Sequence, residues 1–203
     1  MMLETIICRG IIENFNMEES EDRNIKKRIR LLSPAELKDV IPRTKEAEKT
    51  VLKFRQEIEQ VLDNNDNRLI VIMGPCSIHD ADEAYELAKI ANEFRLQVED
   101  KMIIIYRTYF QKPRTRKGWR GLVYNPNAIL KTRELLKDIN ELGLGCATEF
   151  LDRAVCRRIG DMISYGAIGA RTSESQDHRD WVSGYAMPIG IKNTTSGDIG
   201  IAV

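Results

Sequence analysis

The sequence lacks long apolar runs and an excess of charge of either sign. Its apolar segments Leu69–Met73 and Met102–Tyr106 have the length of strands, far short of the ~18 residues of a membrane-spanning helix. Lys and Arg number 31, Asp and Glu number 31, and the formal net charge is +0. Balanced charge gives no general attraction to nucleic acid or to an anionic membrane. We therefore expect neither of them among its partners.

Cysteine and histidine are scarce, with 4 and 2 residues among 203. Cys8, Cys76, Cys146 and Cys156 show no paired spacing, which argues against a disulfide framework and favours a reduced, cytoplasmic protein. The first residues have no basic start followed by a long apolar centre, so no secretory signal peptide is predicted. A hydrophobic content of 42% suits the core of one globular domain.

From Lys45 onward the chain alternates helical and strand-like patterns, after a charged segment with turn signals near Ser33-Pro34 and Ile41-Pro42. We expect strands at 69–73, 102–107, 145–149, 167–171 and 188–192. We expect helices at 45–63, 80–98 and 128–141. Three more are expected: one capped by Asp152, one capped by Ser173, and one that begins at 199–203. In the helix at 80–98, the residues expected to face inward are Ala84, Leu87, Ala88, Ala91 and Phe94. Such alternation predicts a parallel sheet, either a barrel or an open doubly wound sheet.

Most expected strands end in a polar side chain: Cys76, Arg107, Glu149, Arg171 and Lys192. Parallel strands bring their carboxyl ends to one rim, where active sites of barrels lie. Cations at such a rim suit an anionic small substrate, because they clamp phosphate or carboxylate oxygens. A solvated basic turn is the simpler alternative for the cations that follow Tyr106. A small buried side chain is the simpler alternative for Cys76.

Five motifs occur in order: Gly74-Pro-Cys-Ser-Ile-His-Asp80, Arg107-x-Tyr-Phe-x-Lys-Pro-Arg-Thr115, Gly118-Trp-Arg-Gly-Leu122, Gly166-Ala-Ile-Gly-Ala-Arg-Thr172 and Pro188-x-Gly-x-Lys-Asn193. With them the sequence resembles the 3-deoxy-D-arabino-heptulosonate 7-phosphate (DAHP) synthase family, in the branch common in enteric bacteria and yeasts. The resemblance implies a (β/α)8 barrel of the TIM type, which typically takes ~250 residues. We expect an extension outside the family pattern at 1–16, an N-terminal arm and helix at 17–67, and a partial barrel with about strands one to five at 68–203.

Members of this family condense phosphoenolpyruvate with erythrose 4-phosphate and water to DAHP and phosphate, the first step of the shikimate pathway to aromatic amino acids. The resemblance implies eight substrate-binding residues: Arg107, Lys112, Pro113, Arg114, Thr115, Ala170, Arg171 and Lys192. Arg107 and Lys112 would meet phosphoenolpyruvate, Arg171 and Lys192 would hold its phosphate, and Pro113-Arg-Thr115 would hold the sugar phosphate. The expected catalytic residues are Lys112, as a proton donor, and Glu149, beside the attacking water.

The resemblance also implies a divalent metal ion, such as Mn, Fe or Co, that polarises the aldehyde. Cys76 would be its thiolate ligand, whereas Cys146 and Cys156 are expected to be packing residues. The family's further ligands, a His, a Glu and an Asp, come from later strands that have no counterpart in this sequence. We therefore expect the 203-residue chain to be inactive and poorly folded by itself, and intact members to form homo-oligomers.

The sequence departs from the family pattern in three places. Several residues that the family usually has between Tyr124-Asn-Pro126 and Leu130-Lys-Thr-Arg133 are absent. Arg153-Ala-Val-Cys-Arg157 replaces a Thr-Pro-Gln-Tyr-like helix start. Gly184-Tyr-Ala-Met187 lacks the Ser of a turn that borders the inhibitor pocket in several members, which argues against control by an aromatic amino acid.

Two alternatives to the synthase remain open. One is a non-catalytic half-barrel that binds anions or associates with an intact synthase subunit. The other is a related synthase with a different aldose, against which the motifs Lys112-Pro-Arg-Thr115 and Gly118-Trp-Arg-Gly121 argue.

Overall fold

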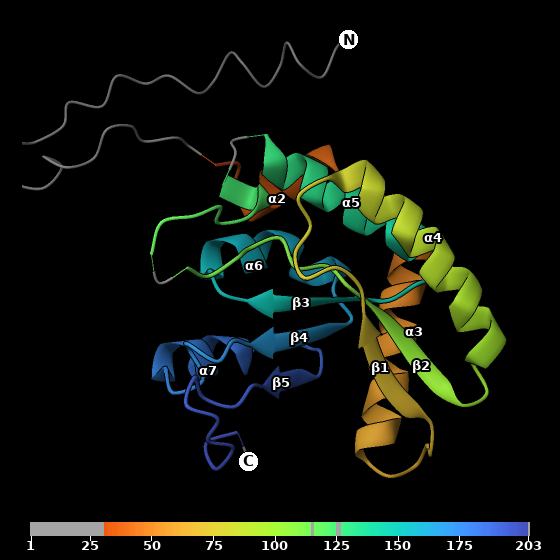
Figure 1. Ribbon diagram of the computed structural model, residues 1–203. Helices are drawn as coiled ribbons and strands as arrows, with labels where there is room; N and C mark the ends of the chain where they lie inside the picture. The colour runs from red at the N-terminus through yellow and green to blue at the C-terminus, as the bar shows by residue number, and fades with distance from the viewer. Residues whose placement is uncertain (1–30, 115, 125–126, 203) are drawn as a thin grey trace, which may run out of the picture. The chain divides into compact units, whose positions relative to one another are not determined.

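The strand-like segments pair into one sheet in which every strand runs parallel to its neighbours (Figure 1). The computed structural model describes residues 31–114, 116–124 and 127–202. The strands are β1 (Leu69–Met73), β2 (Met102–Arg107), β3 (Cys146–Phe150), β4 (Tyr165–Ile168) and β5 (Ile189–Ile191). Their order is β1-β2-β3-β4-β5. A doubly wound sheet reverses its order at a switch point, so the sequential order confirms the α/β barrel class, here an incomplete barrel of the described strands.

The described helices are α2 (Pro34–Val40), α3 (Lys45–Leu62), α4 (Ala81–Val98), α5 (Ala128–Glu141), α6 (Arg153–Ile159) and α7 (Gln176–Val182), with short 3-10 turns η1 (Leu122–Tyr124) and η2 (Gly160–Met162). Side-chain oxygens cap several of them, as Asp80 does for α4 and Asp152 for α6. Such caps satisfy amide groups that a first helical turn leaves without partners. Within the described residues, no helix is both long and apolar enough to cross a membrane.

The core is organised around β2, whose residues Ile103 to Tyr106 are each at most 2% exposed. Alternate strand residues point to opposite faces. On one face Ile103 and Ile105 pack with Phe54 and Ile58 of α3. On the other, the Tyr106 hydroxyl donates a hydrogen bond of 2.9 Å to the Ala84 carbonyl of α4. α4 and α5 lie side by side (Figure 1). Burial of β2 from both faces explains its uninterrupted apolar sequence.

Several predicted elements have different bounds in the structure. Residues 34–40 form helix α2 instead of a turn, which fits the preference of proline for the first helical position. β4 ends at Ile168, so Arg171 lies in the turn beyond the strand. The N-cap of α7 is Ser175 rather than the predicted Ser173. The Ser173 hydroxyl instead donates to the Ala170 carbonyl. Residues 199–202 form a turn rather than a helix.

The predicted inward face of α4 was wrong at two positions. Leu87 and Phe94 are each 40% exposed, whereas Ala84, Ala88 and Ala91 are buried as predicted. The small alanine side chains let α4 approach the sheet closely, and the larger residues remain on its flank. The prediction for residues 1–30, which include the 1–16 extension and part of the arm, falls outside the described residues.

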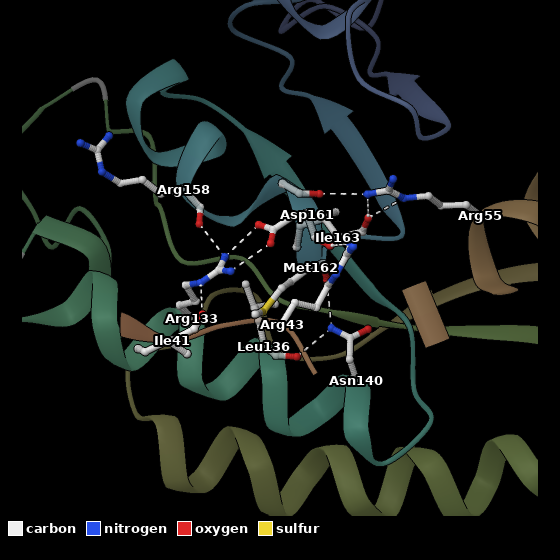
Figure 2. Close-up of polar contacts among 11 residues, drawn as sticks. Ile41, Arg43, Arg55, Arg133, Leu136, Asn140, Arg158, Asp161, Met162 and Ile163 are labelled. Atoms are coloured by element: carbon white, nitrogen blue, oxygen red, sulfur yellow. Dashed lines mark hydrogen bonds and ion pairs between the residues drawn. The ribbon is translucent and has the colours of Figure 1, made fainter. Parts of the chain in front are cut away.

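A buried ion pair connects segments that are far apart in the sequence (Figure 2). The Arg133 guanidinium of α5, which is fully buried, donates hydrogen bonds of 2.8 and 2.9 Å to the two Asp161 carboxylate oxygens. It also donates to the carbonyls of Ile41 at 2.7 Å and Arg158 at 2.9 Å. Burial alone would raise the pKa of the Asp161 carboxyl, but the hydrogen bonds and charge of Arg133 hold it below its ordinary value.

The substitution Arg133→Gln is expected to lower the free energy of unfolding by about 3 kcal/mol, because it leaves a half-buried carboxylate and two carbonyls without their donor. The matched control is Lys131→Gln, an exposed position on the same helix, which should change stability by no more than about 0.5 kcal/mol. Urea unfolding followed by circular dichroism measures both. Equal unfolding free energies for the two variants would contradict this role of Arg133.

Candidate functional site

A cavity of about 640 Å³ lies where the carboxyl ends of β2 to β5 meet. Its lining contains seven basic side chains and one carboxylate, Glu149. The basic residues are Arg107, Lys112, Arg114, Arg116, Lys117, Arg171 and Lys192. They come from strand ends and from the loop after β2. Parallel strands all end at the same edge of the sheet, so these side chains meet there. A cavity with this charge is suited to a ligand that carries several negative charges.

The ends of β1 and β2 approach each other closely at Gly74. This glycine has φ +146°, and a Cβ atom there would lie 3.0 Å from the Arg107 carbonyl oxygen. The close approach lets Arg107 Nη2 donate to the Cys76 carbonyl at 3.0 Å. Lys112 Nζ lies 2.6 Å from Cys76 Sγ. The sequence Gly74-Pro-Cys76 therefore places a thiol beside two cations of the cavity.

The thiol of Cys76 is exposed, whereas Cys146 and Cys156 are buried as predicted. The hydrogen bond from Lys112 lowers the pKa of the Cys76 thiol below its ordinary value, against the opposing effect of its slight burial. The charges of Arg107 and Arg114 lower the pKa further. The exposure of Cys76 excludes the alternative in which it is a small buried side chain.

The loop after β2 folds back on itself and holds basic residues over the strand ends. The Lys112 amide donates to the Arg120 carbonyl at 2.7 Å, and Arg114 Nε donates to the Trp119 carbonyl at 3.0 Å. Gly121 has φ +122°, and a Cβ atom there would lie 2.3 Å from the Phe110 carbonyl oxygen. Only glycine allows this contact without a shift of the backbone. These contacts hold the two ends of the loop together, so the basic residues do not lie on a free turn.

Glu149 and Lys192 form an ion pair across the cavity floor. Lys192 Nζ lies 2.9 Å from Glu149 Oε1, and the Glu149 side chain is 10% exposed. A Cβ atom at Gly169 would lie 2.7 Å from this carboxylate oxygen, so the glycine leaves room for it. Burial alone would lower the pKa of the Lys192 ammonium, but the hydrogen bond and charge of Glu149, with a contribution from Tyr109, raise it. Lys192 is therefore held in its charged form.

The ring of Tyr109 lies against two of the cations. The Arg107 guanidinium carbon is 4.0 Å and Lys192 Nζ is 4.9 Å from the ring centroid. Tyr109 is 8% exposed, so these cation–π contacts are partly shielded from water. Tyr109 belongs to the motif that begins at Arg107, but no role was predicted for it from the sequence. An aromatic residue two positions after the Arg at the end of a strand was the available signal.

The structure brings nearly all residues of the predicted site together. Those that line the cavity are Arg107, Lys112, Pro113, Arg114, Glu149, Ala170, Arg171 and Lys192. Cys76 does not line the cavity but contacts Lys112, which does. Thr115 lies outside the described residues. Lining residues that the sequence did not indicate include Gln111, Arg116, Lys117 and Leu151. The roles of the predicted residues in binding and catalysis remain predictions.

The described residues were also compared with the donor set of a metal site. They contain no group of three or more His, Cys, Asp or Glu side chains that could hold a metal ion. His178 is not available, because its ring nitrogens contact the Ser175 hydroxyl at 2.9 Å and the Leu151 carbonyl at 3.3 Å. Among the described cysteines, Cys76 is the exposed one, and it lies beside the cavity. The described residues therefore do not form a metal site by themselves.

Comparison with known proteins gives consistent matches. The model of the DAHP synthetase I family matches residues 42–203. The chain is 45% identical over 182 residues to the Trp-sensitive phospho-2-dehydro-3-deoxyheptonate aldolase of Buchnera aphidicola subsp. Acyrthosiphon pisum, which covers 85% of this chain and 52% of that protein. It is 42% identical over 194 residues to the Phe-sensitive aldolase of Escherichia coli (strain K12), over 91% of this chain and 55% of that protein.

A solved structure of the same kind of protein is also similar. The phospho-2-dehydro-3-deoxyheptonate aldolase of Francisella tularensis SCHU S4 superposes with a TM-score of 0.85 and 42% sequence identity. The match covers 88% of this chain and 55% of that one. The chain thus spans about half the length of the curated relatives it matches.

Proposed function

The chain belongs to the DAHP synthetase I family, and from this premise we propose that it serves the condensation of phosphoenolpyruvate with erythrose 4-phosphate and water to DAHP and phosphate. This is the first step of the shikimate pathway. The observation that supports the proposal best is the cavity with seven basic side chains and a single carboxylate at the strand ends. Both substrates are anionic, and each needs several cationic donors.

Phosphoenolpyruvate carries a phosphate and a carboxylate, and the proposal places it among Arg107, Arg171 and Lys192. Tyr109 holds the Arg107 and Lys192 side chains by cation–π contact without neutralising their charge. Arg171 is exposed in the turn beyond β4, where it is free to reach a phosphate. The loop residues Pro113 and Arg114 also line the cavity. They are the proposed contacts of the sugar phosphate, together with Thr115 by its place in the motif.

Lys112 and Glu149 are proposed to handle protons. Lys112 connects the basic loop to the end of β1 through its contact with Cys76, a position from which an ammonium group could donate a proton between the two substrates. Glu149 is a carboxylate within hydrogen-bonding distance of Lys192. In this proposal it orients the water that attacks the enolpyruvate carbon. Proton transfer by positioned groups typically contributes 10²–10⁴-fold to rate.

The divalent metal, the oligomeric state and the cellular location are further parts of the proposal. Cys76 would supply one thiolate to the metal, which suits several divalent ions. Two free, buried cysteines fit a reducing, cytoplasmic environment. Homo-oligomer formation is proposed from the family resemblance alone, and gel filtration of the native protein would test it.

A thiolate role for Cys76 has a spectroscopic test. In a background with Cys8→Ser, added Co²⁺ should give a near-ultraviolet charge-transfer band from sulfur to cobalt, and Cys76→Ser should remove it. Cys146 and Cys156 serve as internal controls, since burial raises the pKa of both thiols. A band of equal intensity in the Cys76→Ser protein would show that Cys76 is not a ligand.

The condensation itself is tested on the protein isolated from its own cells, so that any further segment or subunit is present. Phosphate release from phosphoenolpyruvate and erythrose 4-phosphate with Mn²⁺ should fall at least about 100-fold in Lys112→Met. The exposed control Lys49→Met should retain full activity.

Two outcomes of this assay favour the alternatives. Release of phosphate with arabinose 5-phosphate, but not with erythrose 4-phosphate, would indicate a synthase with a different aldose. Binding of phosphoenolpyruvate without turnover would indicate a non-catalytic anion-binding protein or a subunit that associates with an intact synthase.

A further inference from the structure

The segment that follows β2 is bonded to the elements on both of its sides, which fixes the position of Tyr109. The Tyr109 carbonyl accepts a hydrogen bond of 2.8 Å from the Ile78 amide in the loop after β1. On the other side, the Thr108 amide and hydroxyl both donate to the Ala147 carbonyl of β3, at 2.7 and 3.0 Å. Thr108 is fully buried. Because the backbone at residues 108 and 109 is held in this network, the Tyr109 ring has a defined place in the cavity.

Arg107, the last residue of β2, has few contacts besides this ring. Its Nη2 donates to the Cys76 carbonyl at 3.0 Å. Its Nε is buried and has no hydrogen-bond partner among the described residues. One hydrogen bond leaves a guanidinium group free to turn about that bond. The Tyr109 ring, 4.0 Å from the guanidinium carbon, therefore provides the further contact that fixes the orientation of Arg107.

Lys192 reaches the same ring from the other side of the described sheet, because it directly follows β5. Its Nζ lies 4.9 Å from the ring centroid and 2.9 Å from Glu149 Oε1. An aromatic ring attracts a cation through its quadrupole and leaves the charge of the cation in place. One nearly buried ring thus determines where two like charges from separate strands lie relative to each other.

We propose that Tyr109 is a positioning residue that fixes the separation between Arg107 and Lys192, and that this separation makes the cavity select a ligand with two linked anionic groups over a ligand with one. The inference rests on the function proposed above, since phosphoenolpyruvate carries a phosphate and a carboxylate on one small, rigid skeleton. Such a ligand contacts both cations at once only where their spacing matches its own. Inorganic phosphate has a single anionic group, which can settle beside either cation.

A change in the electron distribution of the ring, without a change in its shape, tests this role. Tyr109→Phe keeps the negative face of the ring. Pentafluorophenylalanine at the same position has nearly the same volume, but its fluorine atoms withdraw electrons and reverse the attraction for cations. Tyr85 provides the matched control, because its ring lies 4.9 Å from Lys89 Nζ on α4, outside the described lining of the cavity. Calorimetric titration of the protein, with any further segment or subunit present, measures the affinities for phosphoenolpyruvate and inorganic phosphate.

The expected result is a loss of selectivity that follows the electrons of the ring. Tyr109→Phe should bind phosphoenolpyruvate within about threefold of the wild-type affinity. Pentafluorophenylalanine at position 109 should weaken phosphoenolpyruvate binding at least about tenfold, because the ring then repels both cations, but phosphate binding no more than about threefold. The same replacement at Tyr85 should change neither affinity.

The outcomes separate this inference from the function on which it rests. Equal affinity for phosphoenolpyruvate in the phenylalanine and pentafluorophenylalanine proteins, or an equal loss for both ligands, would overturn the role of Tyr109 and leave the proposed function in place. A loss in Tyr109→Phe as large as that with pentafluorophenylalanine would assign the effect to the hydroxyl group and also overturn it. No binding of phosphoenolpyruvate to the wild-type protein would contradict the proposed function and this inference together.

Discussion

The parallel sheet imposes the main constraint on this molecule, because it directs the carboxyl ends of all its strands to one edge. Basic residues that follow different strands are brought together there, although like charges repel. The structure holds them with few opposite charges. Tyr109 contacts Arg107 and Lys192 through its ring, and Glu149 pairs with Lys192 alone. The cavity thus keeps a large excess of positive charge, which an anionic ligand can neutralise.

Backbone carbonyls also position cations away from the cavity at the strand ends. Arg55 donates to three backbone carbonyls, and Arg133 donates to two carbonyls besides the Asp161 carboxylate. A carbonyl orients a guanidinium group but leaves its net charge in place, whereas a carboxylate cancels it. The buried pair of Arg133 and Asp161 therefore connects α5 to η2 without leaving an uncompensated charge in the core.

Much of the fold could be predicted because short apolar strands and helix caps are local signals. β1 and β2 have the predicted bounds, and Asp152 caps α6 as expected. The gathering of Arg107, Glu149 and Lys192 could be predicted because parallel strands bring their carboxyl ends to one rim. Features that depend on tertiary contacts could not be read in this way. A charged side chain is usually exposed, yet Arg133 is fully buried and pairs with a residue 28 positions away. Tyr109 stands two positions after Arg107, but its contact with Lys192 depends on the packing of strands that are far apart in the sequence.

The proposed function requires that the cations at the strand ends bind phosphoenolpyruvate. Calorimetric titration of the protein with phosphoenolpyruvate tests this most directly, with Lys192→Gln compared with the exposed control Lys49→Gln. We expect the affinity for phosphoenolpyruvate to fall at least about tenfold in Lys192→Gln, because a charged hydrogen bond is lost, and to be unchanged in the control. Equal affinity in both variants, or no binding to the wild-type protein, would contradict it.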